Sequence, residues 1–460
     1  MFSGKRAALL GALGLLVGLV LSGVFAVPKV TSFGPDSGSP HVPARAPIRI
    51  AFDRPMDRIS VEARLSVEPA ISGVVTWEGN TLLYRPAQSW PTGQDILVGL
   101  EAGARSTRFL PVLRSLSWSF RVGDPRLAYL WPSEGASDLY LLDLTDRKRS
   151  RLTKTEAGVM DYSLGPDGAS IVYTALNEGG SSEIRFMDLA TGSDELLHAC
   201  DAASRCQAPV LSPDGNLLAF EQFDWETSAA GIRIPGTRQV WLMSLDPAGQ
   251  PTRVQPEEQA TNSPDWSPDG ILTYYNHSLG VVTLLEPASF EAPNTVPNGL
   301  GLLGSWSPDG KYLILPEIVF PNVTELKGGG AADFYSHLYR VEAATLIIRD
   351  LSLGSVEDAS PVYSPDGEWI AFGRKFLDDR WTPGRQVWVM RADGSQPRPI
   401  TDDPDFSHAS LTWNPDSTRI AYMRLNLADP NEMPEIWMTD RTNKVREFLV
   451  EGGYLPRWIP

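Results

Sequence analysis

The chain has 460 residues, a length that suits two or three domains. It is acidic, because 56 Asp and Glu residues against 40 Lys and Arg residues give a formal charge of −16 at pH 7. A surface of this sign repels phosphate backbones, so the composition argues against a nucleic-acid partner.

The N-terminal segment 1–27 is predicted to be a membrane anchor. Lys5 and Arg6 precede an uncharged run from Ala7 to Val27, and about 20 such residues cross a bilayer as a helix. The basic pair places the N-terminus inside the cell. We therefore favour a single-pass transmembrane helix in the cell membrane, with the bulk of the chain extracytoplasmic. A signal peptide cleaved after Ala26 is the alternative, and it exports the rest of the chain as well.

Residues 28–122 are predicted to form a β-sandwich. Short runs of alternating apolar residues are separated by Gly, Pro, Asn and Asp at intervals of about 8–12 residues, which is typical of that fold. The EGN at 78–80 predicts a hairpin. The runs are IRIAF (48–52), RLSVEP (64–69), GVVTWEGNTLLYRP (73–86), DILVGL (95–100) and SLSWSFRV (115–122).

This stretch resembles the SbsA-type bacterial immunoglobulin-like domain of S-layer and other surface proteins. The similarity rests on IRIAFDRPMD (48–57), WEGNTLLYRP (77–86) and the closing SWSFRV (117–122). The resemblance implies a spacer or adhesion module that is usually not catalytic. We interpret Pro55-Met56-Asp57 as a turn whose methionine packs inside.

A four-residue turn motif, SPDG or a close variant of it, recurs through the rest of the chain. Its proline presets φ at the second position and its glycine supplies the left-handed residue at the end, so each copy joins two antiparallel strands. A third strand and a short fourth run follow each turn. Four strands in units of about 40–57 residues predict propeller blades. The copies begin at Gly165, Ser212, Ser267, Ser307, Ser364 and Asn414.

The two ends of residues 124–460 predict how the ring closes. RLAYLW (126–131) and the runs up to 153 form a blade that lacks its first strand, and YLPRWIP (454–460) matches NSPDWSP (262–268), a first strand. We therefore expect an all-β chain in which the sandwich precedes a seven-bladed propeller, with strand 454–460 pairing in the 126–153 blade. Six blades is the alternative, if the N-terminal fragment is a linker.

These repeats resemble TolB-like and prolyl-oligopeptidase-type β-propellers. The similarity rests on the turn motif and the strand after it, and it indicates a fold rather than an activity. The chain departs from the motif at Gly165, which stands for Ser, and at Ser417, which stands for Gly. The Cβ of Ser417, at the last position of the motif, costs roughly 1 kcal/mol if the turn is unchanged.

Cys200 and Cys206 are the two cysteines of the chain. In an oxidising compartment, such a close and isolated pair is typical of a disulfide that fixes a surface loop, and unpaired thiols are the alternative. We expect no metal site, because His198 and Asp201 add too few ligands for a structural zinc. No other cofactor is predicted.

Candidate binding residues lie in the loops between the second and third strands of a blade, on the face opposite the turn motifs. Three of these loops are long (221–238, 316–336 and 373–385), and loops on a rigid scaffold concentrate binding residues. Aromatic and Arg anchors suit protein or glycan contact. Packing of these rings over the outer strands is the alternative. The candidates are Phe223, Trp225, Phe334, Tyr335, Phe376, Asp378, Asp379, Arg380 and Trp381.

We predict no catalytic residues. The prolyl-oligopeptidase resemblance implies an attached hydrolase domain, and the sequence has neither the GxSxG of that domain nor an HExxH motif. We expect a monomeric, membrane-anchored scaffold that recognises a protein or glycan of the cell envelope through its loop face. The alternative is an extracytoplasmic hydrolase or lyase with carboxylates at the channel mouth.

Overall fold

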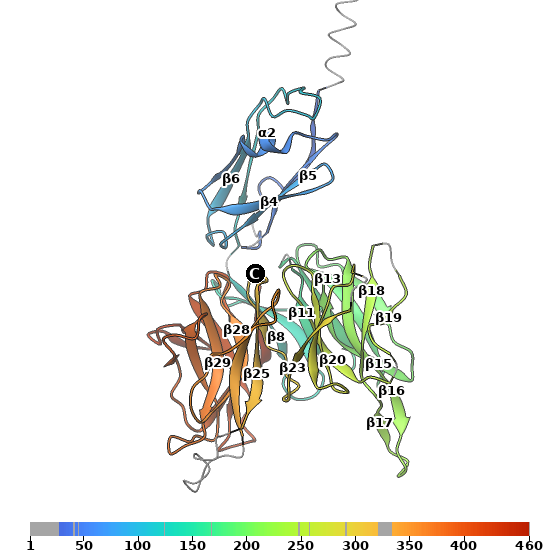
Figure 1. The fold of residues 1–460 in the computed structure, drawn as a ribbon, viewed down its shortest axis with the longest axis vertical. Helices are drawn as coiled ribbons and strands as arrows, with labels where there is room; N and C mark the ends of the chain where they lie inside the picture. Colours follow the sequence, from blue (N-terminus) through green and yellow to red (C-terminus); the bar gives the residue numbers. More distant parts are fainter. Residues whose placement is uncertain are drawn as a thin grey trace, which may run out of the picture. The chain divides into compact units, whose positions relative to one another are not determined.

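A computed structural model describes residues 27–459, apart from 40, 41, 45, 124, 167, 247, 248, 257, 290, 291 and 321–333 (Figure 1). The chain divides into two compact units, Met1–Gly123 and Asp124–Pro460. The predicted anchor at 1–27 lies outside the described residues, except for its last position. Within the described part of the chain, no helix has the length and apolar character needed to span a membrane.

The first unit is a sandwich of two antiparallel sheets, with strand orders β1-β2-β5-β4 and β3-β6-β7. Side chains alternate across each strand, so Ile48, Ile50 and Phe52 of one strand all point into the core. The elements are β1 (Val30–Gly34), β2 (Ile48–Phe52), α2 (Arg58–Glu62), β3 (Leu65–Glu68), β4 (Gly73–Glu78), β5 (Thr81–Pro86), β6 (Asp95–Leu100) and β7 (Leu116–Arg121).

Two local predictions for this unit are confirmed, and one element was not foreseen. The EGN turn joins β4 to β5, with Glu78 opposite Thr81. Met56 packs inside, as interpreted from the sequence. The unforeseen element is α2, a short helix whose N-cap is Asp57; the Asp57 carboxylate accepts a hydrogen bond from the Ser60 amide.

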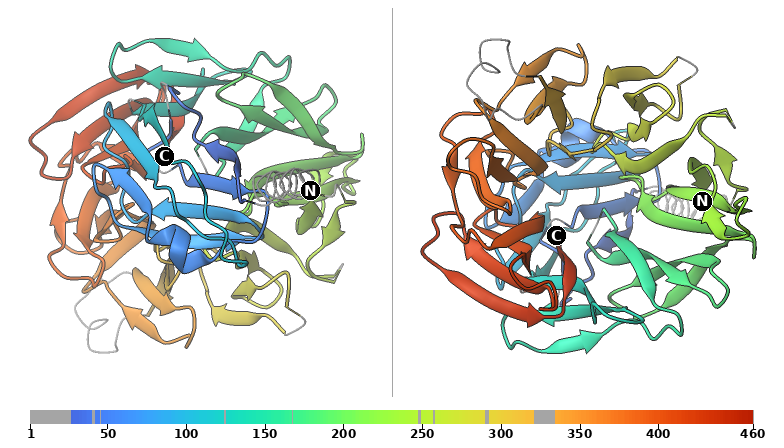
Figure 2. Two further views of the ribbon diagram at one scale, coloured as in Figure 1. Left: turned by 90° about the horizontal axis from the view of Figure 1, so that it is seen from above. Right: turned by 90° about the horizontal axis from the view of Figure 1, so that it is seen from below.

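The second unit contains seven antiparallel blades of four main strands each, counted over the described residues. Figure 2 shows the blades around a common axis. Blades 5 and 6 are also joined by one parallel bridge, Ser336 to Glu357. Blades 1 to 3 consist of β8 (Arg126–Trp131), β9 (Asp138–Asp143), β10 (Arg149–Arg151) and β36 (Tyr454–Trp458); β11 (Val159–Leu164), β12 (Ser170–Leu176), β13 (Ser182–Asp188) and β14 (Asp194–Ala199); and β15 (Ser204–Leu211), β16 (Leu217–Thr227), β18 (Gln239–Ser244) and β19 (Thr252–Arg253), with β17 (Arg233–Pro235) added to β16.

The remaining strands repeat this pattern, and their register is antiparallel throughout each blade. Blades 4 to 7 consist of β20 (Thr261–Trp266), β21 (Leu272–Asn276), β22 (Val281–Leu285) and β23 (Asn294–Pro297); β24 (Ser305–Trp306), β25 (Tyr312–Val319), β26 (Tyr335–Glu342) and β27 (Ile348–Asp350); β28 (Val356–Tyr363), β29 (Trp369–Phe376), β30 (Gln386–Arg391) and β31 (Arg398–Pro399); and β32 (Phe406–Trp413), β33 (Arg419–Asn426), β34 (Glu435–Asp440) and β35 (Arg446–Glu451).

The C-terminal strand closes the ring. β36 pairs antiparallel with β8, with Tyr454 opposite Leu130 and Trp458 opposite Leu127. Trp458 is buried among side chains of blades 1 and 7. The first blade is therefore built from both ends of this unit. Closure of this kind leaves no sheet edge open at the seam.

Each turn motif is a tight hairpin between the first and second strands of a blade. In the blade 6 turn, the Gly367 amide donates to the Ser364 carbonyl, and the Trp369 amide donates to the Ser364 hydroxyl. Gly367 has a φ of +73°. Ser417 has a φ of +65° at the matching position of blade 7, and its hydroxyl accepts a hydrogen bond from the Asp366 amide at 3.0 Å. This contact between neighbouring turns offsets part of the expected strain.

Candidate functional site

The first long loop forms a β-hairpin rather than an irregular loop. β16 continues to Thr227, and β17 pairs with its end, with Trp225 opposite Pro235 and Thr227 opposite Arg233. Figure 1 shows this hairpin extending beyond the other strands of blade 3. Because side chains alternate across a strand, Trp225 and Arg233 share one face of the hairpin, and Ile234 lies on the other.

Trp225 lies at the centre of a cation–aromatic cluster. The guanidinium carbons of Arg205 and Arg233 lie 4.8 Å and 4.6 Å from the indole centroid. The Trp225 Nε1 donates to the Gly180 carbonyl at 3.1 Å, and the Arg205 Nε donates to the same oxygen at 3.0 Å. Cation–aromatic contacts of this kind stabilise by about 0.5–2 kcal/mol each. The predicted candidate Trp225 is thus half-buried and held in one orientation.

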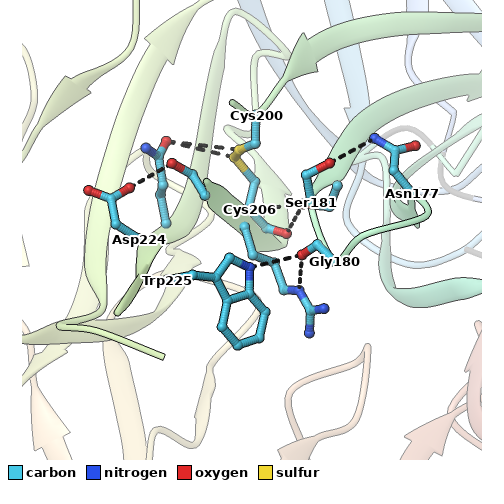
Figure 3. Close-up of a disulfide and its surroundings, with 11 residues drawn as sticks. Asn177, Gly180, Ser181, Cys200, Cys206, Asp224 and Trp225 are labelled. Atoms are coloured by element: carbon cyan, nitrogen blue, oxygen red, sulfur yellow. Dashed lines mark hydrogen bonds between the residues drawn. A yellow bond between two sulfur atoms is a disulfide. The ribbon is translucent and has the colours of Figure 1, made fainter. Parts of the chain in front are cut away.

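The disulfide lies beside this cluster (Figure 3). Cys200 and Cys206 are bonded, as predicted, with their Cα atoms 6.0 Å apart. The loop that they close supplies the Ala203 carbonyl, which accepts from the Trp225 amide at 2.8 Å. His198 is the one further side chain near the two sulfurs that could ligate a metal in the described chain. Because the sulfurs are bonded to each other, they are not available as thiolate ligands.

The blade 6 loop carries a second group of charged and aromatic side chains. Arg380 pairs with the Asp378 carboxylate and lies 3.7 Å from the Phe376 ring centroid. The hydrogen bond from Arg380 lowers the pKa of Asp378. Trp381 is 58% exposed, with the Lys375 ammonium 5.1 Å from its ring. Asp379 is exposed beside them. This loop therefore presents an open indole next to a paired acid and base.

The second long loop is described only at its ends, because 321–333 lie outside the described residues. Phe334 is 46% exposed. Tyr335 is buried and stacks on His337, whose Nδ1 is 2.8 Å from the Asp350 carboxylate and whose Nε2 is 2.9 Å from the Gly354 carbonyl. Burial alone would lower the pKa of His337, but these two acceptors outweigh it and raise that pKa.

Two predicted surface anchors are therefore corrected. Phe223 and Tyr335 are only 3% and 5% exposed, so neither presents its ring to a partner. Phe223 packs edge-on against Trp225, with ring centroids 5.2 Å apart. The alternative reading, in which the rings pack over the strands, holds for these two positions. Trp225, Phe334, Phe376, Asp378, Asp379, Arg380 and Trp381 keep solvent-accessible surface.

A set of carboxylates on the first and second strands of blades 2 to 4 was not predicted from the sequence. The Asp161 carboxylate accepts from the Ala208 amide at 2.7 Å, and the Glu221 carboxylate accepts from the Ser263 amide at 2.7 Å. Burial raises the pKa of Asp161 to about 6, and burial likewise raises the pKa of Asp265 to about 6. For Asp161 and Glu221, the available sequence signal was an acidic residue in a largely apolar stretch, VMDYSL and LLAFEQF.

These carboxylates have a clear structural role. Ala208 and Ser263 have φ values of +51° and +56° at bulges in β15 and β20. A bulge leaves one amide without a partner in its own ladder. Asp161 and Glu221 each satisfy such an amide on the following blade, which ties neighbouring blades together. Asp265 differs, because the charge of Arg457 on β36 lowers its pKa and opposes part of the effect of burial.

His408 is buried on the innermost strand of blade 7 and is neutral at physiological pH. Its Nδ1 donates to the Arg385 carbonyl at 2.9 Å. The Asp403 carboxylate is 3.7 Å from Nε2, but Asp403 already pairs with Arg446 and Arg424. Burial first, and then the charge of Arg424, lower the pKa of His408 to about 4.

Neither of these two buried imidazoles is hydrogen-bonded to a nucleophile, because His337 contacts the Asp350 carboxylate and the Gly354 carbonyl, and His408 contacts the Arg385 carbonyl. The buried pair of Asp358 and Arg374 is fully satisfied, with two hydrogen bonds of 2.7 Å and 2.6 Å. The described residues place a set of aromatic and cationic groups at the surface, on the loop side of blades 3 and 6. Such groups are typical of contact with a partner.

Comparison with known proteins supports the architecture. Residues 26–122 match the bacterial Ig-like domain family. An uncharacterized protein of Agrobacterium fabrum is 27% identical over 207 residues, which is 43% of this chain and 58% of that protein. The uncharacterized peptidase YuxL of Bacillus subtilis is 27% identical over 245 residues, which is 50% of this chain and 32% of that protein. The chain thus spans less than two thirds of either relative.

Solved structures also resemble this chain over most of its length. A prolyl endopeptidase structure matches with a TM-score of 0.51 and 14% identity, over 72% of this chain and 49% of that chain. A putative TolB from Agrobacterium tumefaciens matches with a TM-score of 0.38 and 18% identity, over 74% of this chain and all of that chain (100%). The prolyl endopeptidase match agrees with the resemblance of the repeats, and an identity this low indicates the fold alone.

Proposed function

We propose that this protein is a non-enzymatic binding scaffold, anchored in the cell membrane by segment 1–27, that recognises a partner of the cell envelope through the loop face of its propeller. The observation that carries the proposal is the set of aromatic–cation contacts on that face. Trp225 with Arg205 and Arg233, and Phe376 with Arg380, are held in fixed geometry. Pre-oriented Trp and Arg side chains are the commonest energetic anchors of protein interfaces.

The proposal is tested by capture from envelope extracts on immobilised 28–460. We expect a variant with Trp225→Ala and Trp381→Ala to lose the captured partner. Lys311→Ala is the matched control, because Lys311 is exposed in a turn motif on the opposite face. A partner retained equally by both variants would contradict recognition through the loop face. A carbonate wash of membranes tests the anchor separately, since release of the protein would mean that the segment is cleaved.

The alternative function is an extracytoplasmic hydrolase or lyase with its site in the ring. The observation that favours it is the raised pKa of Asp161 and Asp265, both about 6, because carboxyls of this kind serve as general acids near neutral pH. The similarity to the Bacillus subtilis protein named as an uncharacterized peptidase also favours a hydrolase. Turnover of peptide or polysaccharide substrates that is lost in Asp161→Asn and Asp265→Asn would favour the enzyme over the scaffold.

A further inference from the structure

Arg205 and Arg233 form a cationic pair without a carboxylate partner in the described chain. Arg205 donates to the Gly180 carbonyl, and Arg233 donates to the Gly179 and Ala202 carbonyls. Arg374, which also stacks on an aromatic ring, has the carboxylate of Asp358 as its partner, whereas Arg340 over Tyr312 donates to a backbone carbonyl. Two guanidinium groups on one indole form a local positive centre in a chain whose overall charge is −16.

The two guanidinium groups are held near each other although their charges repel. Arg205 Nη2 and Arg233 Nη1 both lie against Gly180, at 3.4 Å and 3.5 Å from the position that a Cβ would take there. Burial, and then the charge of Arg233, lower the pKa of Arg205. An anion bound between them would relieve this repulsion, and the fork of a guanidinium matches a carboxylate with two parallel hydrogen bonds.

The cluster is rigid before any ligand arrives. The Trp225 amide and the Arg233 guanidinium both bond to carbonyls of the loop closed by Cys200–Cys206, those of Ala203 and Ala202. The Trp225 indole is fixed by its own hydrogen bond to Gly180. Groups that are already ordered lose less conformational entropy on binding, which favours affinity.

The surroundings favour a protein segment over a glycan. The indole surface that would stack on a sugar ring is already in contact with two guanidinium groups. Beside the cluster, β17 pairs only with β16 in the described chain, so its outer edge can pair with another strand through the amide and carbonyl of Arg233 and the carbonyl of Pro235. The face of the hairpin opposite Arg233 carries Ile232 and Ile234, which are 63% and 39% exposed.

We propose that the Arg205–Trp225–Arg233 cluster and the edge of β17 together bind an extended segment of a protein partner in which acidic and apolar residues alternate. The side chains of a strand added to β17 point alternately to the two faces. Acidic residues would meet Arg205 and Arg233, and apolar residues would meet Ile232 and Ile234. This inference rests on the proposed function and names the partner chemistry of one part of the loop face.

The test uses the chain 28–460 and a fluorescent synthetic peptide of alternating Glu and Val, with anisotropy as the readout. We expect Arg233→Gln to weaken binding by about 10- to 100-fold, because it removes a charged hydrogen-bonding group. Arg233→Lys keeps the charge without the fork and should recover only part of the affinity. Arg349→Gln is the matched control, since Arg349 is an exposed arginine on β27 of blade 5. Arg233 lies on an exposed hairpin, so its variants are expected to fold, and a thermal melt checks this.

Several results would overturn the proposal. Equal binding by Arg233→Gln and the wild type would show that the cluster is not the site. Equal binding of a peptide with the same residues in separate Glu and Val blocks would exclude strand addition. Tighter binding of polygalacturonate, lost in Arg233→Gln, would assign the cluster to a glycan, and self-association lost in that variant would assign it to a second copy of this chain. Capture of an envelope partner that depends on Trp381 but not on Arg233 would leave the proposed function standing and this inference wrong.

Discussion

The Asp161 side chain both links two blades and titrates at a raised pKa. Its carboxylate satisfies the amide of Ala208 on the next blade, and burial raises its pKa to about 6 from an ordinary value of 3.8. The same contact that orders the bulge therefore carries an electrostatic cost once the group ionises. A neutral side chain with an oxygen in the same place would keep the hydrogen bond without that cost.

We predict that Asp161→Asn changes the pH dependence of stability. As the pH rises from about 4 to about 6, the unfolded chain loses its proton first, so the wild type loses stability over this window and the variant does not. The free energy of unfolding of the variant, relative to the wild type, should rise by on the order of 1–3 kcal/mol between these values. Urea unfolding at several pH values measures it. Asp405→Asn, at an exposed carboxylate, is the control, and a difference that does not vary with pH would contradict the argument.

Ser417 departs from the local preference of the turn motif for glycine. The turn motif favours glycine at this position for its left-handed backbone, and Ser417 does adopt a φ of +65°. Its hydroxyl accepts the amide of Asp366 in the neighbouring turn, a contact that glycine lacks. The departure from the motif is thus matched by an interaction between blades, which a reading of one turn in isolation does not reveal.

At the scale of elements, five of the innermost strands share a bulge that places a residue with positive φ in the same position. The φ values of Ala208, Ser263, Ser360, Ser410 and Leu455 lie between 50° and 56°. Proline follows in four of these five strands and leucine in the fifth. Proline suits the position because it has no amide to satisfy. The recurrence of this feature in β36 supports its role as the first strand of blade 1.

The disulfide is the element whose loss should loosen the loop face of blade 3. We predict that the intact mass of the protein purified without reductant corresponds to oxidised Cys200 and Cys206, two hydrogen atoms lighter than the dithiol. Replacing both with Ser should lower the free energy of unfolding by on the order of 2–3 kcal/mol in the chain-entropy view. Denaturant unfolding with and without a reductant measures the effect, and the double variant is the control because a reductant should not change it. Free thiols in the protein purified without reductant would contradict the prediction.

The sequence predicted the parts of the molecule that repeat and missed the parts that depend on distant contacts. The turn motifs located six hairpins, and the match of 454–460 to 262–268 located the closing strand, because each blade meets the same local requirements. The Trp225 cluster could not be assembled in this way. Trp225 and Gly180 are 45 residues apart and belong to different blades, so only the packing of two blades brings them together.

The same reasoning explains the two corrected anchors. Phe223 and Tyr335 were assigned to the surface from their place in long loops, but β16 and β26 extend far enough to carry both rings into the packed part of a blade. Strand ends are not marked by a breaker residue at either position. Trp381, in contrast, follows the Asp378 turn and stays exposed as expected.

For the whole molecule, closure by β36 should decide whether the propeller unfolds as one unit. β36 supplies the inner partner of β8 and buries Trp458 at the seam of blades 1 and 7. Ile459, the next residue, is buried among side chains of blades 1 and 2. The Tyr162 hydroxyl donates to the Leu455 carbonyl at 2.6 Å, and the Trp458 amide donates to the Thr412 hydroxyl at 3.4 Å. Blades 2 and 7 thus both depend on this strand.

We predict that truncation after Gly453 removes the cooperative melt of the propeller. The change exposes the inner edge of β8 and leaves buried apolar surface in water, a loss of several side chains at about 1.5–3 kcal/mol each, and the open edge should also promote self-association. Calorimetry and light scattering measure the two effects. A synthetic peptide YLPRWIP, the sequence of 454–460, should restore part of the melting temperature when added in trans, and the same peptide with Trp458→Ala should not. An unchanged melt after truncation would mean that blade 1 does not need its C-terminal strand.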